Sequence, residues 1–391
     1  MHTILTVNGG SSSLKCALFE LKNETFSLLY NFKLGNILND ASFKAIDKTG
    51  TVVENSTPDF SEIPAEGRHQ ACLNAVLTWL EHTLPNNTLK AIGHRVVHGG
   101  STFDEPQLID DRLIEQLSAL IPLAPLHQPF NLKLIEACRA LAPKLPQVAC
   151  FDTMFHSNQS ALEQNYAIPR KYTEEGVHRY GFHGLSYEFI QRQLDQLEEM
   201  PLNTVVCHLG AGASMCAIKD GKSIASSMGF TAVDGLPMGS RCGNLDPGVL
   251  LYLQRHYHMT TDELEAFIYK KSGWLGVSGI SSDMLQLHQS NQAEAEEAIE
   301  MFCYRAALEI GRLSAALEGL EQLVFTGGVG ENDADVRQRI LRRCHWLGLT
   351  YSEEANQSSE CLISTPDSNV KVRVIPTNEE AMIATHALEL T

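Results

Sequence analysis

Positive charge is scarce in this chain of 391 residues. Lys and Arg together number 30 against 47 Asp and Glu, which gives a formal net charge of −17. That deficit argues against a protein that tracks nucleic-acid phosphates or binds an anionic membrane surface. It leaves room for a small anionic ligand, because a few local Arg or Lys side chains can outweigh the global charge at short range.

Long apolar runs and paired cysteines are also missing. No stretch approaches the roughly 18 apolar residues of a membrane span, and the N-terminal MHTILTVNGG lacks the basic start of a secretory signal. The ten cysteines are scattered singly, without CxxC pairs or metal-ligand spacing, so we expect buried thiols in a reducing compartment. These absences predict a cytoplasmic protein that has neither a membrane nor nucleic acid as a partner.

The expected order of elements repeats along the chain. Residues 3–20 indicate a strand, a turn at the Asn-Gly pair 8–9 and a second strand, and residues 204–224 repeat this pattern. Apolar spacing predicts helices over 67–84 and 293–317. No long linker separates the halves. We therefore predict the α/β class, with two duplicated domains around a cleft.

Four glycine-containing turns stand at expected strand ends: NGGSSSLK at 8–15, HLGAGAS at 208–214, GVSGISSD at 276–283 and GGVGEN at 327–332. Glycine lets backbone N–H groups approach an anion closely. One such turn would most often be an ordinary tight turn, but four favour nucleotide binding. None fits GxxxxGK[ST] or a helix-opening GxGxxG, so those two phosphate sites are not supported.

Charged and imidazole groups cluster beside these turns. They are Arg95, His127, Asp152, His183 and Arg241. A guanidinium between glycines is suited to bind a carboxylate or a phosphoryl oxygen. Each residue alone would more often be a satisfied core group, whereas the set of five favours a site.

Nine motif segments stand in order between residues 5 and 384: NGGSSSLK, GHRVVHGG, LAPLHQP, FDTMFH, RYGFHGLS, HLGAGAS, SMGFTAVDGLPMGSRCGNLDPG, FTGGVGEN and IPTNEEAMIA. In sequence and in order, they resemble the signature segments of the acetate kinase family. The resemblance implies two duplicated actin-like (ribonuclease-H-like) ATPase domains around a nucleotide cleft. Residues 1–152 with 380–391 would form the carboxylate side, and residues 153–379 the nucleotide side. It also implies a homodimer.

The resemblance further implies a reversible phosphoryl transfer from ATP to acetate that gives acetyl phosphate and ADP. Mg²⁺ would be required, with Mn²⁺ as an alternative. Two other functions stay open at this point. One is a propionate or butyrate kinase, and the other is a nucleotide or acyl-phosphate sensor that binds without turnover.

Residue roles follow by matching motifs. Arg95 and Arg241 would hold the carboxylate and the transferring phosphoryl group, His183 would hydrogen-bond that group, and His127 and Asp152 would complete the catalytic set. Asn8 and Glu379 would hold the metal, and Val97, Leu126 and Phe182 would surround the acyl methyl. The ATP contacts would be Ser11, Ser13, Lys15, His208, Leu209, Gly210, Ala211, Gly212, Asp283, Met284, Leu285, Gly327, Gly328, Val329, Gly330 and Glu331.

The role of Asp152 has two readings. A general base is not needed, because a carboxylic acid acceptor with a pKa of about 4 is already ionised at neutral pH. Asp152 would instead position the metal or orient an arginine. If Asp152 positions the metal, Asp152→Asn is expected to lose activity with a shifted Mg²⁺ dependence.

The sequence departs from the family pattern at several positions. Ala211 replaces an asparagine and Leu285 an arginine on the nucleotide side, which predicts weaker ATP binding or another phosphate donor. Ala232 replaces a proline beside the acyl site, so propionate or a longer acid could fit. Gln128 and Asn244 are further changes. Cys242, beside Arg241, is either a space-filling residue or an oxidation-sensitive thiol.

Overall fold

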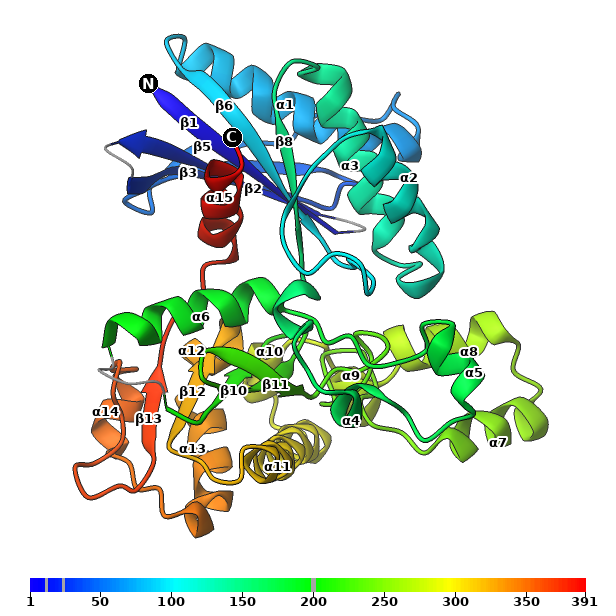
Figure 1. Cartoon of the computed structure of the whole chain (residues 1–391), viewed down its shortest axis with the longest axis vertical. Helices are drawn as coiled ribbons and strands as arrows, with labels where there is room; N and C mark the ends of the chain where they lie inside the picture. The colour runs from blue at the N-terminus through cyan, green and yellow to red at the C-terminus, as the bar shows by residue number, and fades with distance from the viewer. Residues whose placement is uncertain (11–12, 23–24, 198–201) are drawn as a thin grey trace. The chain divides into compact units, whose positions relative to one another are not determined.

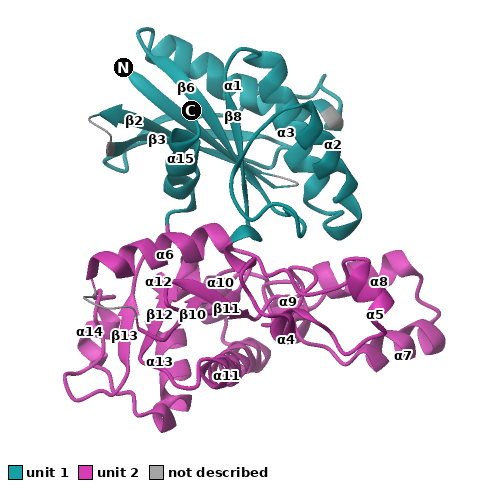
Figure 2. Cartoon of the chain, viewed as in Figure 1, with its two compact units in different colours: residues 1–154, 378–391 teal, residues 155–377 magenta. Residues whose placement is uncertain are grey.

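The computed structural model describes residues 1–10, 13–22, 25–197 and 202–391. The chain forms two compact units (Figure 2). Unit 1 holds residues 1–154 and 378–391, and unit 2 holds residues 155–377. Glu379 thus belongs to the same unit as Asn8 and not, as predicted from the sequence, to the second domain. The reason is local: Asn378 caps helix α15 (Glu379–Glu389), its Oδ1 accepting from the Ala381 N–H at 2.9 Å.

Unit 1 is built on an eight-stranded sheet in the order β5-β4-β3-β2-β1-β6-β8-β7 (Figure 1). Strands β1 to β5 pair antiparallel in sequence order, whereas β1, β6 and β8 are parallel. The strands are β1 (His2–Gly9), β2 (Leu14–Lys22), β3 (Thr25–Gly35), β4 (Ser42–Asp47), β5 (Val52–Ser56), β6 (Thr88–Val96), β7 (Gln107–Leu108) and β8 (Gln147–Phe151).

The hairpin predicted at the N-terminus is present, but Asn8 and Gly9 are not its turn. Both lie in β1, where Asn8 pairs with Lys15 and Gly9 with Leu14. The Gly10 N–H donates to the Ser13 carbonyl at 2.9 Å and closes the loop. Gly9 packs closely in the strand, since an added Cβ would lie 2.0 Å from Leu134 Cδ1 and would displace that side chain. The Asn-Gly signal therefore marks close packing and a site residue.

Helices cover both faces of the unit 1 sheet. Helices α1 (Arg68–Thr83) and α3 (Gln128–Leu141) pack on the face that carries Leu5 and Val7, and α2 (Asp111–Ala119) packs on α3. Helix α15 packs against β1, β6 and β8 on the other face, where a Cβ on Gly93 would meet Ile383 at 2.4 Å. Because side chains alternate along a strand, Asn8 and Arg95 point toward the α15 face.

Unit 2 repeats this topology. Its sheet has the order β11-β10-β9-β12-β13, with β9 to β11 antiparallel and β9, β12 and β13 parallel, the pattern of β3-β2-β1-β6-β8 in unit 1. Helix α6 (Gly184–Leu197) packs on β9, and α11 (Ala293–Ala316) contacts β9, β10 and β11. The strands are β9 (Thr204–His208), β10 (Ser214–Lys219), β11 (Lys222–Ser226), β12 (Gln322–Thr326) and β13 (Lys371–Val374). The predicted duplication of an α/β unit is confirmed.

The remaining elements are short or lie outside the sheets. They are α4 (Ala161–Gln164), α5 (Arg170–Glu174), α7 (Pro247–Tyr257), α8 (Thr261–Lys270), α9 (Gly273–Ser278), α10 (Met284–Gln289), α12 (Gly327–Asn332), α13 (Ala334–Arg343), α14 (Glu353–Gln357) and four 3₁₀ turns at Ala65–Gly67, Ile121–Leu123, Met154–His156 and His345–Leu347. None of the described helices combines the length and apolar character that a membrane crossing requires.

The cysteines are free, as predicted, but not all are buried. Eight of the ten are buried, whereas Cys242 is half-buried and Cys361 is exposed. Burial raises the pKa of the Cys242 thiol despite the adjacent arginine, and its Sγ donates to the Gly243 carbonyl. A raised thiol pKa lowers reactivity, so the structure supports the space-filling reading of Cys242.

Candidate active site

Arg95 is the centre of a polar cluster in unit 1. It is the last residue but one of β6 and lies beside the ends of β1 and β8. Its Nε donates to Asp152 Oδ1 at 2.9 Å and its Nη2 to Asp152 Oδ2 at 2.6 Å, while Nη1 donates to Asn8 Oδ1 at 3.2 Å. Asp152 is only 2% exposed, so this bidentate ion pair fixes the plane of the Arg95 guanidinium.

Glu379 completes this cluster from the first turn of α15. Its Oε2 lies 4.0 Å from Arg95 Nη1. Burial raises the pKa of Glu379 to about 7, and the nearby Asp152 and Glu380 add to the shift, while Arg95 and Lys15 oppose it. The same carboxylates raise the pKa of Arg95 and keep it charged, although burial acts in the opposite direction. The cluster therefore holds more negative charge than its own cations neutralise.

This donor set fits a hard divalent cation. The amide oxygen of Asn8 and the carboxylate of Glu379 are the oxygen ligands that Mg²⁺ prefers, and Mg²⁺ keeps several waters, so it needs few protein ligands. A cation here would favour the ionised form of Glu379, against the burial and the nearby carboxylates that raise its pKa. Across the described ranges of the chain, no group of three or more His, Cys, Asp or Glu side chains is placed to hold a metal ion.

The other predicted residues of unit 1 lie at different depths. Lys15 is exposed on β2 opposite Asn8, and Ser13 is half-buried, whereas Ser11 lies outside the described residues. Val97 is 7% exposed, and its N–H donates to Asn131 Oδ1 at 3.0 Å. Leu126 and His127 are half-buried in the segment that leads into α3.

Gln128 has a structural role. It is fully buried, and its Nε2 donates to the His98 carbonyl at 3.1 Å and to the Leu117 carbonyl at 3.3 Å. These bonds tie the start of α3 to the segment that follows β6. They hold the two segments that carry Val97 and His127, after β6 and before α3, without placing the Gln128 amide in the site.

His94, next to Arg95, is the basis of a pH prediction. It is buried, and burial lowers its pKa to about 4, against a weaker opposing effect of its 2.7 Å bond to Gln147. A histidine pKa that is lower in the folded state gives stability that is present above about pH 6.5 and lost as the pH falls toward 4. We expect wild type to lose on the order of 3 kcal/mol through this residue over that range.

Urea unfolding at pH 7 and pH 4 measures this effect. His94→Gln is expected to have a smaller drop in unfolding free energy between the two pH values than wild type. An equal drop in both proteins would contradict the assignment, whatever the stability of the variant at pH 7.

His183 occupies a strained position at the start of α6 in unit 2. Its φ is +58°, a left-handed conformation that costs a non-glycine residue about 1–3 kcal/mol. Its Nδ1 lies 2.8 Å from Ser214 Oγ, and its ring stacks on His208 with centroids 4.4 Å apart. A Cβ on Gly212 would lie 3.6 Å from His183 Nε2, so the glycine turn passes close to this nitrogen. The structure thus brings His183, His208 and Gly212 together.

Phe182 and Arg241 are each held by a hydrogen bond within unit 2. The Phe182 carbonyl lies 2.9 Å from His156 Nε2, and the Phe182 side chain is 2% exposed. Arg241 is half-buried, and its Nη1 donates to the carbonyl of Ala232 at 3.0 Å. Ala232 thus orients the arginine through its backbone carbonyl.

Two glycine segments of unit 2 lie side by side. The Val329 and Gly330 N–H groups donate to the Leu209 carbonyl at 2.8 and 3.1 Å. Gly327, with φ of +77°, allows this approach, because a Cβ there would lie 2.8 Å from the Leu209 carbonyl oxygen. Within these segments Leu209 is fully buried, Ala211 is exposed, and the glycines of 327–332 form the short helix α12.

Glu331 organises the end of this segment. Its Oε1 accepts from the Gly327 N–H at 2.8 Å and from the Thr377 N–H at 3.0 Å. Arg337, which the sequence analysis did not identify, is fully buried, and its Nη1 donates to the carbonyls of Gly330 and Glu331, both at 2.9 Å. No sequence motif marks Arg337, since α13 reads as a charged surface helix.

The three adjacent residues at the start of α10 differ in placement. Asp283 caps the helix, its Oδ1 accepting from the Leu285 N–H at 2.9 Å. Met284 is 4% exposed and packs in the core, whereas Leu285 is 65% exposed. Of the three residues at the start of α10, Asp283 and Leu285 have side chains accessible to a ligand.

Asn244, a position where the sequence departs from the family pattern, makes a structural contact. Its Oδ1 accepts from the Gly235 N–H at 3.0 Å.

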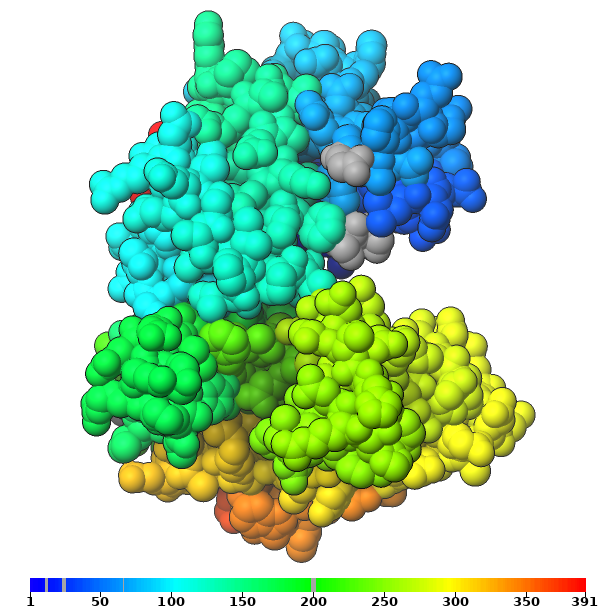
Figure 3. Space-filling view, turned by 90° about the vertical axis from the view of Figure 1, so that its right-hand side faces the viewer, coloured from blue at the N-terminus to red at the C-terminus, as the bar shows by residue number. Residues whose placement is uncertain are grey.

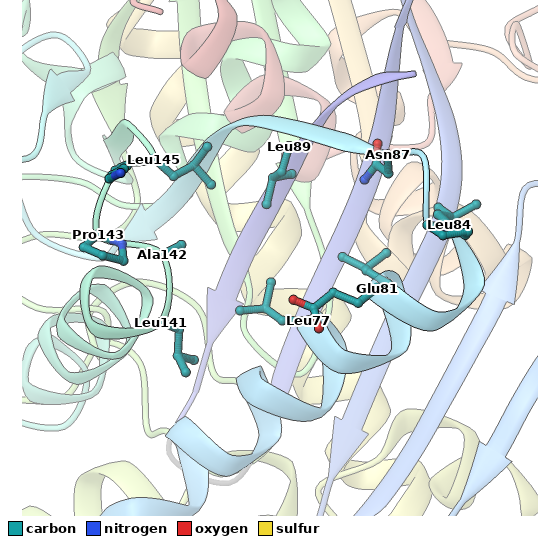
Figure 4. Close-up of a pocket in the computed structure, with 12 residues that line it drawn as sticks. Leu77, Glu81, Leu84, Asn87, Leu89, Leu141, Ala142, Pro143 and Leu145 are labelled. Carbon is teal, nitrogen blue, oxygen red and sulfur yellow. The ribbon is translucent and has the colours of Figure 1, made fainter.

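A cavity of about 600 Å³ lies elsewhere in unit 1 (Figure 4). It is formed by the ends of α1 and α3 and the segment that follows α3, with Leu77, Leu84, Leu89 and Leu141 among its lining residues. The cavity contains none of the predicted site residues. It is therefore separate from the Arg95 cluster.

Known proteins resemble this chain over its whole length. Residues 3–385 match the profile of the Acetokinase family. The acetate kinase of Rhodopseudomonas palustris (strain ATCC BAA-98 / CGA009) is 48% identical over 394 residues, 99% of this chain and 98% of the relative. For that of Rickettsia felis the identity is 43% over 389 residues, again 99% and 98%.

Solved structures agree with these sequence matches. A propionate kinase from Francisella tularensis has a TM-score of 0.91 at 35% identity, and the acetate kinase of Porphyromonas gingivalis has a TM-score of 0.88 at 33% identity. Each match covers 100% of both chains. The predicted α/β fold of two actin-like halves is confirmed.

Proposed function

The chain belongs to the acetokinase family, and we propose that it transfers the γ-phosphoryl group of ATP to a carboxylate oxygen of acetate. The products are acetyl phosphate and ADP. The observation that carries this assignment beyond sequence similarity is the geometry of Arg95, whose Nε and Nη2 are bound by Asp152 while Nη1 faces Asn8 and Glu379. A guanidinium fixed in this way is preorganised to bind an anionic group.

The chemistry asks little of the protein beyond positioning and charge. The ionised acceptor carboxylate attacks the γ-phosphorus, the bond to the ADP oxygen breaks, and negative charge spreads over the equatorial phosphoryl oxygens. Cationic and N–H donors supplied by Arg95, Arg241 and His183 stabilise that charge more in the transition state than in the ground state. No residue has to remove a proton from the acceptor.

Asn8 and Glu379 would hold Mg²⁺. When bound, the ion would neutralise charge on the nucleotide phosphates. The contacts to ATP would come from Lys15, the serines beside it and the segments 208–212 and 327–331. The exposed Ala211 and Leu285 supply no hydrogen-bonding side chain, so we propose that ATP is bound mainly through backbone groups and glycine-lined contacts.

Trapping of the acyl phosphate as a hydroxamate tests this function. Product is expected only when ATP, Mg²⁺ and a short-chain acid are all present. If the protein binds nucleotide but forms no product with acetate, propionate or butyrate, the result would instead favour a sensor that binds without turnover.

Ala232 favours a second activity on propionate. The solved Francisella tularensis relative is a propionate kinase, and here an alanine whose carbonyl holds Arg241 stands where the family pattern has a proline. Ala232→Pro is expected to reduce kcat/KM for propionate relative to acetate by about tenfold. This is the lower end of the range of about 10–200-fold by which one methylene changes the discrimination between two substrates.

Parallel kinetics with both acids check this prediction, and Ala232→Gly is the matched control because it keeps the space open. The ratio of the two kcat/KM values should stay near wild type in Ala232→Gly. A ratio that does not change in Ala232→Pro would show that residue 232 does not set acyl-chain preference.

An exposed apolar patch on α7 supports a homodimer. Leu251, Tyr252 and Tyr257 are 50%, 55% and 62% exposed, and α7 and α8 lie on the face of unit 2 seen in Figure 3. Clustered exposed aromatic and aliphatic side chains are typical of protein interfaces. We propose that this patch contributes to self-association. The cytoplasmic location stays a prediction from the sequence.

A further inference from the structure

Behind His183, two buried hydroxyl groups form a chain of hydrogen bonds. Ser214 Oγ lies 2.8 Å from His183 Nδ1 and 2.5 Å from the Tyr187 hydroxyl. Ser214 and Tyr187 are both fully buried. The chain lies within unit 2, where Tyr187 follows His183 by four residues and its N–H donates to the His183 carbonyl at 3.1 Å.

The sequence explains why these groups meet. Tyr187 packs in the core of unit 2 with Cys216 and Ile218 of β10. Because side chains of a strand alternate between its faces, Ser214 points to the same face as Cys216 and Ile218. The face of β10 that packs on α6 therefore brings a serine beneath the first turn of α6, where His183 and Tyr187 lie.

The direction of each hydrogen bond follows from the number of partners. Within the described chain, the Tyr187 hydroxyl has Ser214 Oγ as its single hydrogen-bond partner. If it only accepted, its own O–H would be buried without an acceptor, which is costly. Tyr187 therefore donates to Ser214. The single hydrogen of Ser214 Oγ must then go to its other partner, His183 Nδ1.

An acceptor Nδ1 fixes the tautomer of neutral His183. With Nδ1 unprotonated, the ring proton is on Nε2. Nε2 is the nitrogen that faces the glycine turn, as the 3.6 Å distance to a Cβ on Gly212 shows. This is the atom from which His183 can donate to a bound phosphoryl oxygen.

We propose that Tyr187 and Ser214 are positioning residues that hold His183 as its Nε2–H tautomer, so that Nε2 donates a hydrogen bond to the transferring phosphoryl group. The assignment of a phosphoryl contact to His183 rests on the proposed function. The relay itself does not, since it follows from buried groups that need a partner. It also explains how a strained His183 backbone is held in place, because the side chain is anchored at Nδ1.

Two measurements on Ser214→Ala test the relay. The ¹⁵N shifts of the imidazole ring, recorded for neutral His183, report which nitrogen carries the proton. Wild type is expected to be in the Nε2–H form, and Ser214→Ala a mixture of both tautomers. In the same variant kcat is expected to fall about tenfold, with KM for acetate and ATP within about twofold of wild type, because one positioned hydrogen bond is lost.

Ser226→Ala is the matched control. Ser226 is also a buried serine on the neighbouring strand β11, but its hydroxyl has no hydrogen-bond partner in the described structure. Its loss should leave both kcat and the His183 tautomer unchanged. Tyr187→Phe keeps the ring and removes the donor, so it should increase the Nδ1–H fraction and lower kcat by about threefold.

The outcomes separate the relay from the proposed function. An Nδ1–H ring in wild type would overturn the relay, as would wild-type kcat and tautomer in Ser214→Ala or, if that variant does not fold, in Tyr187→Phe. If wild type forms no acyl phosphate but the Nε2–H tautomer is present and depends on Ser214, the relay stands and the kinase assignment fails.

Discussion

Replacement of Arg95 by alanine is expected to lower kcat by about 10³–10⁵-fold, the range found for arginines that stabilise a transferring phosphoryl group. The loss should be this large because Arg95 is bound through Nε and Nη2 by Asp152 and so presents Nη1 with little freedom. Arg95→Lys should recover little activity, since an ammonium group cannot make the two-pronged bond that sets the orientation.

The control for this variant is Arg139→Ala. Arg139 is a half-buried surface arginine of α3, also in unit 1, that pairs with Asp111 at 2.6 Å, so its removal should leave kcat near wild type. An Arg95→Ala enzyme with kcat within tenfold of wild type would contradict the role given to Arg95.

The variant Asp152→Asn tests how Arg95 is held. Both carboxylate oxygens of Asp152 are bonded to Arg95, which favours the arginine-orienting role over the metal-positioning role. We therefore expect kcat to fall about 10²-fold, as for a misplaced catalytic group, with the Mg²⁺ dependence of the rate unchanged. If the variant instead needs a higher Mg²⁺ concentration to reach its half-maximal rate, Asp152 positions the metal.

Replacement of Arg241 by alanine is the second change with a large expected effect, a loss of about 10³-fold in kcat. Arg241 is half-buried, and its Nη1 is anchored at 3.0 Å on the Ala232 carbonyl. Its backbone is also confined, because a Cβ on Gly273 would lie 2.7 Å from the Arg241 carbonyl oxygen. A cation held at this position is preorganised for charge that develops during the transfer.

Steady-state kinetics on Arg241→Ala and Arg305→Ala check this role. Arg305 is exposed on α11, so its loss should have no measurable effect on kcat. If both variants lose activity equally, Arg241 acts through general stability or net charge. Thermal melting of both proteins distinguishes a folding defect from a loss of transition-state binding.

The sequence predicts the fold well because repeated local patterns determine it. The strand, turn and strand at residues 3–20 and again at 204–224 give β1-β2 and β9-β10, and helix 293–317 is found as Ala293–Ala316. The error at Asn8 and Gly9 has a physical reason. The Asn-Gly pair satisfies a hairpin signal, but here Gly9 makes room for Leu134, which comes from a helix far along the chain.

The site can be predicted only in part from the sequence. Motifs identify Arg95, Asp152, Asn8 and Glu379 as site residues, and in the structure these four residues lie together in unit 1. Motifs do not show whether a side chain is buried in the core instead of facing a ligand, as the Met284 side chain is. Supporting residues are harder still, since Arg337, Ser214 and Tyr187 act through long-range packing that only the folded chain reveals.

The most direct test of the central claim is a ³¹P NMR time course of the purified protein with ATP, Mg²⁺ and acetate. We predict that an acetyl phosphate resonance grows as the γ-phosphate resonance of ATP declines, and that Arg95→Ala abolishes this exchange. ATP that stays intact, or that is converted to inorganic phosphate with no acetyl phosphate, while the protein still binds nucleotide, would contradict the account.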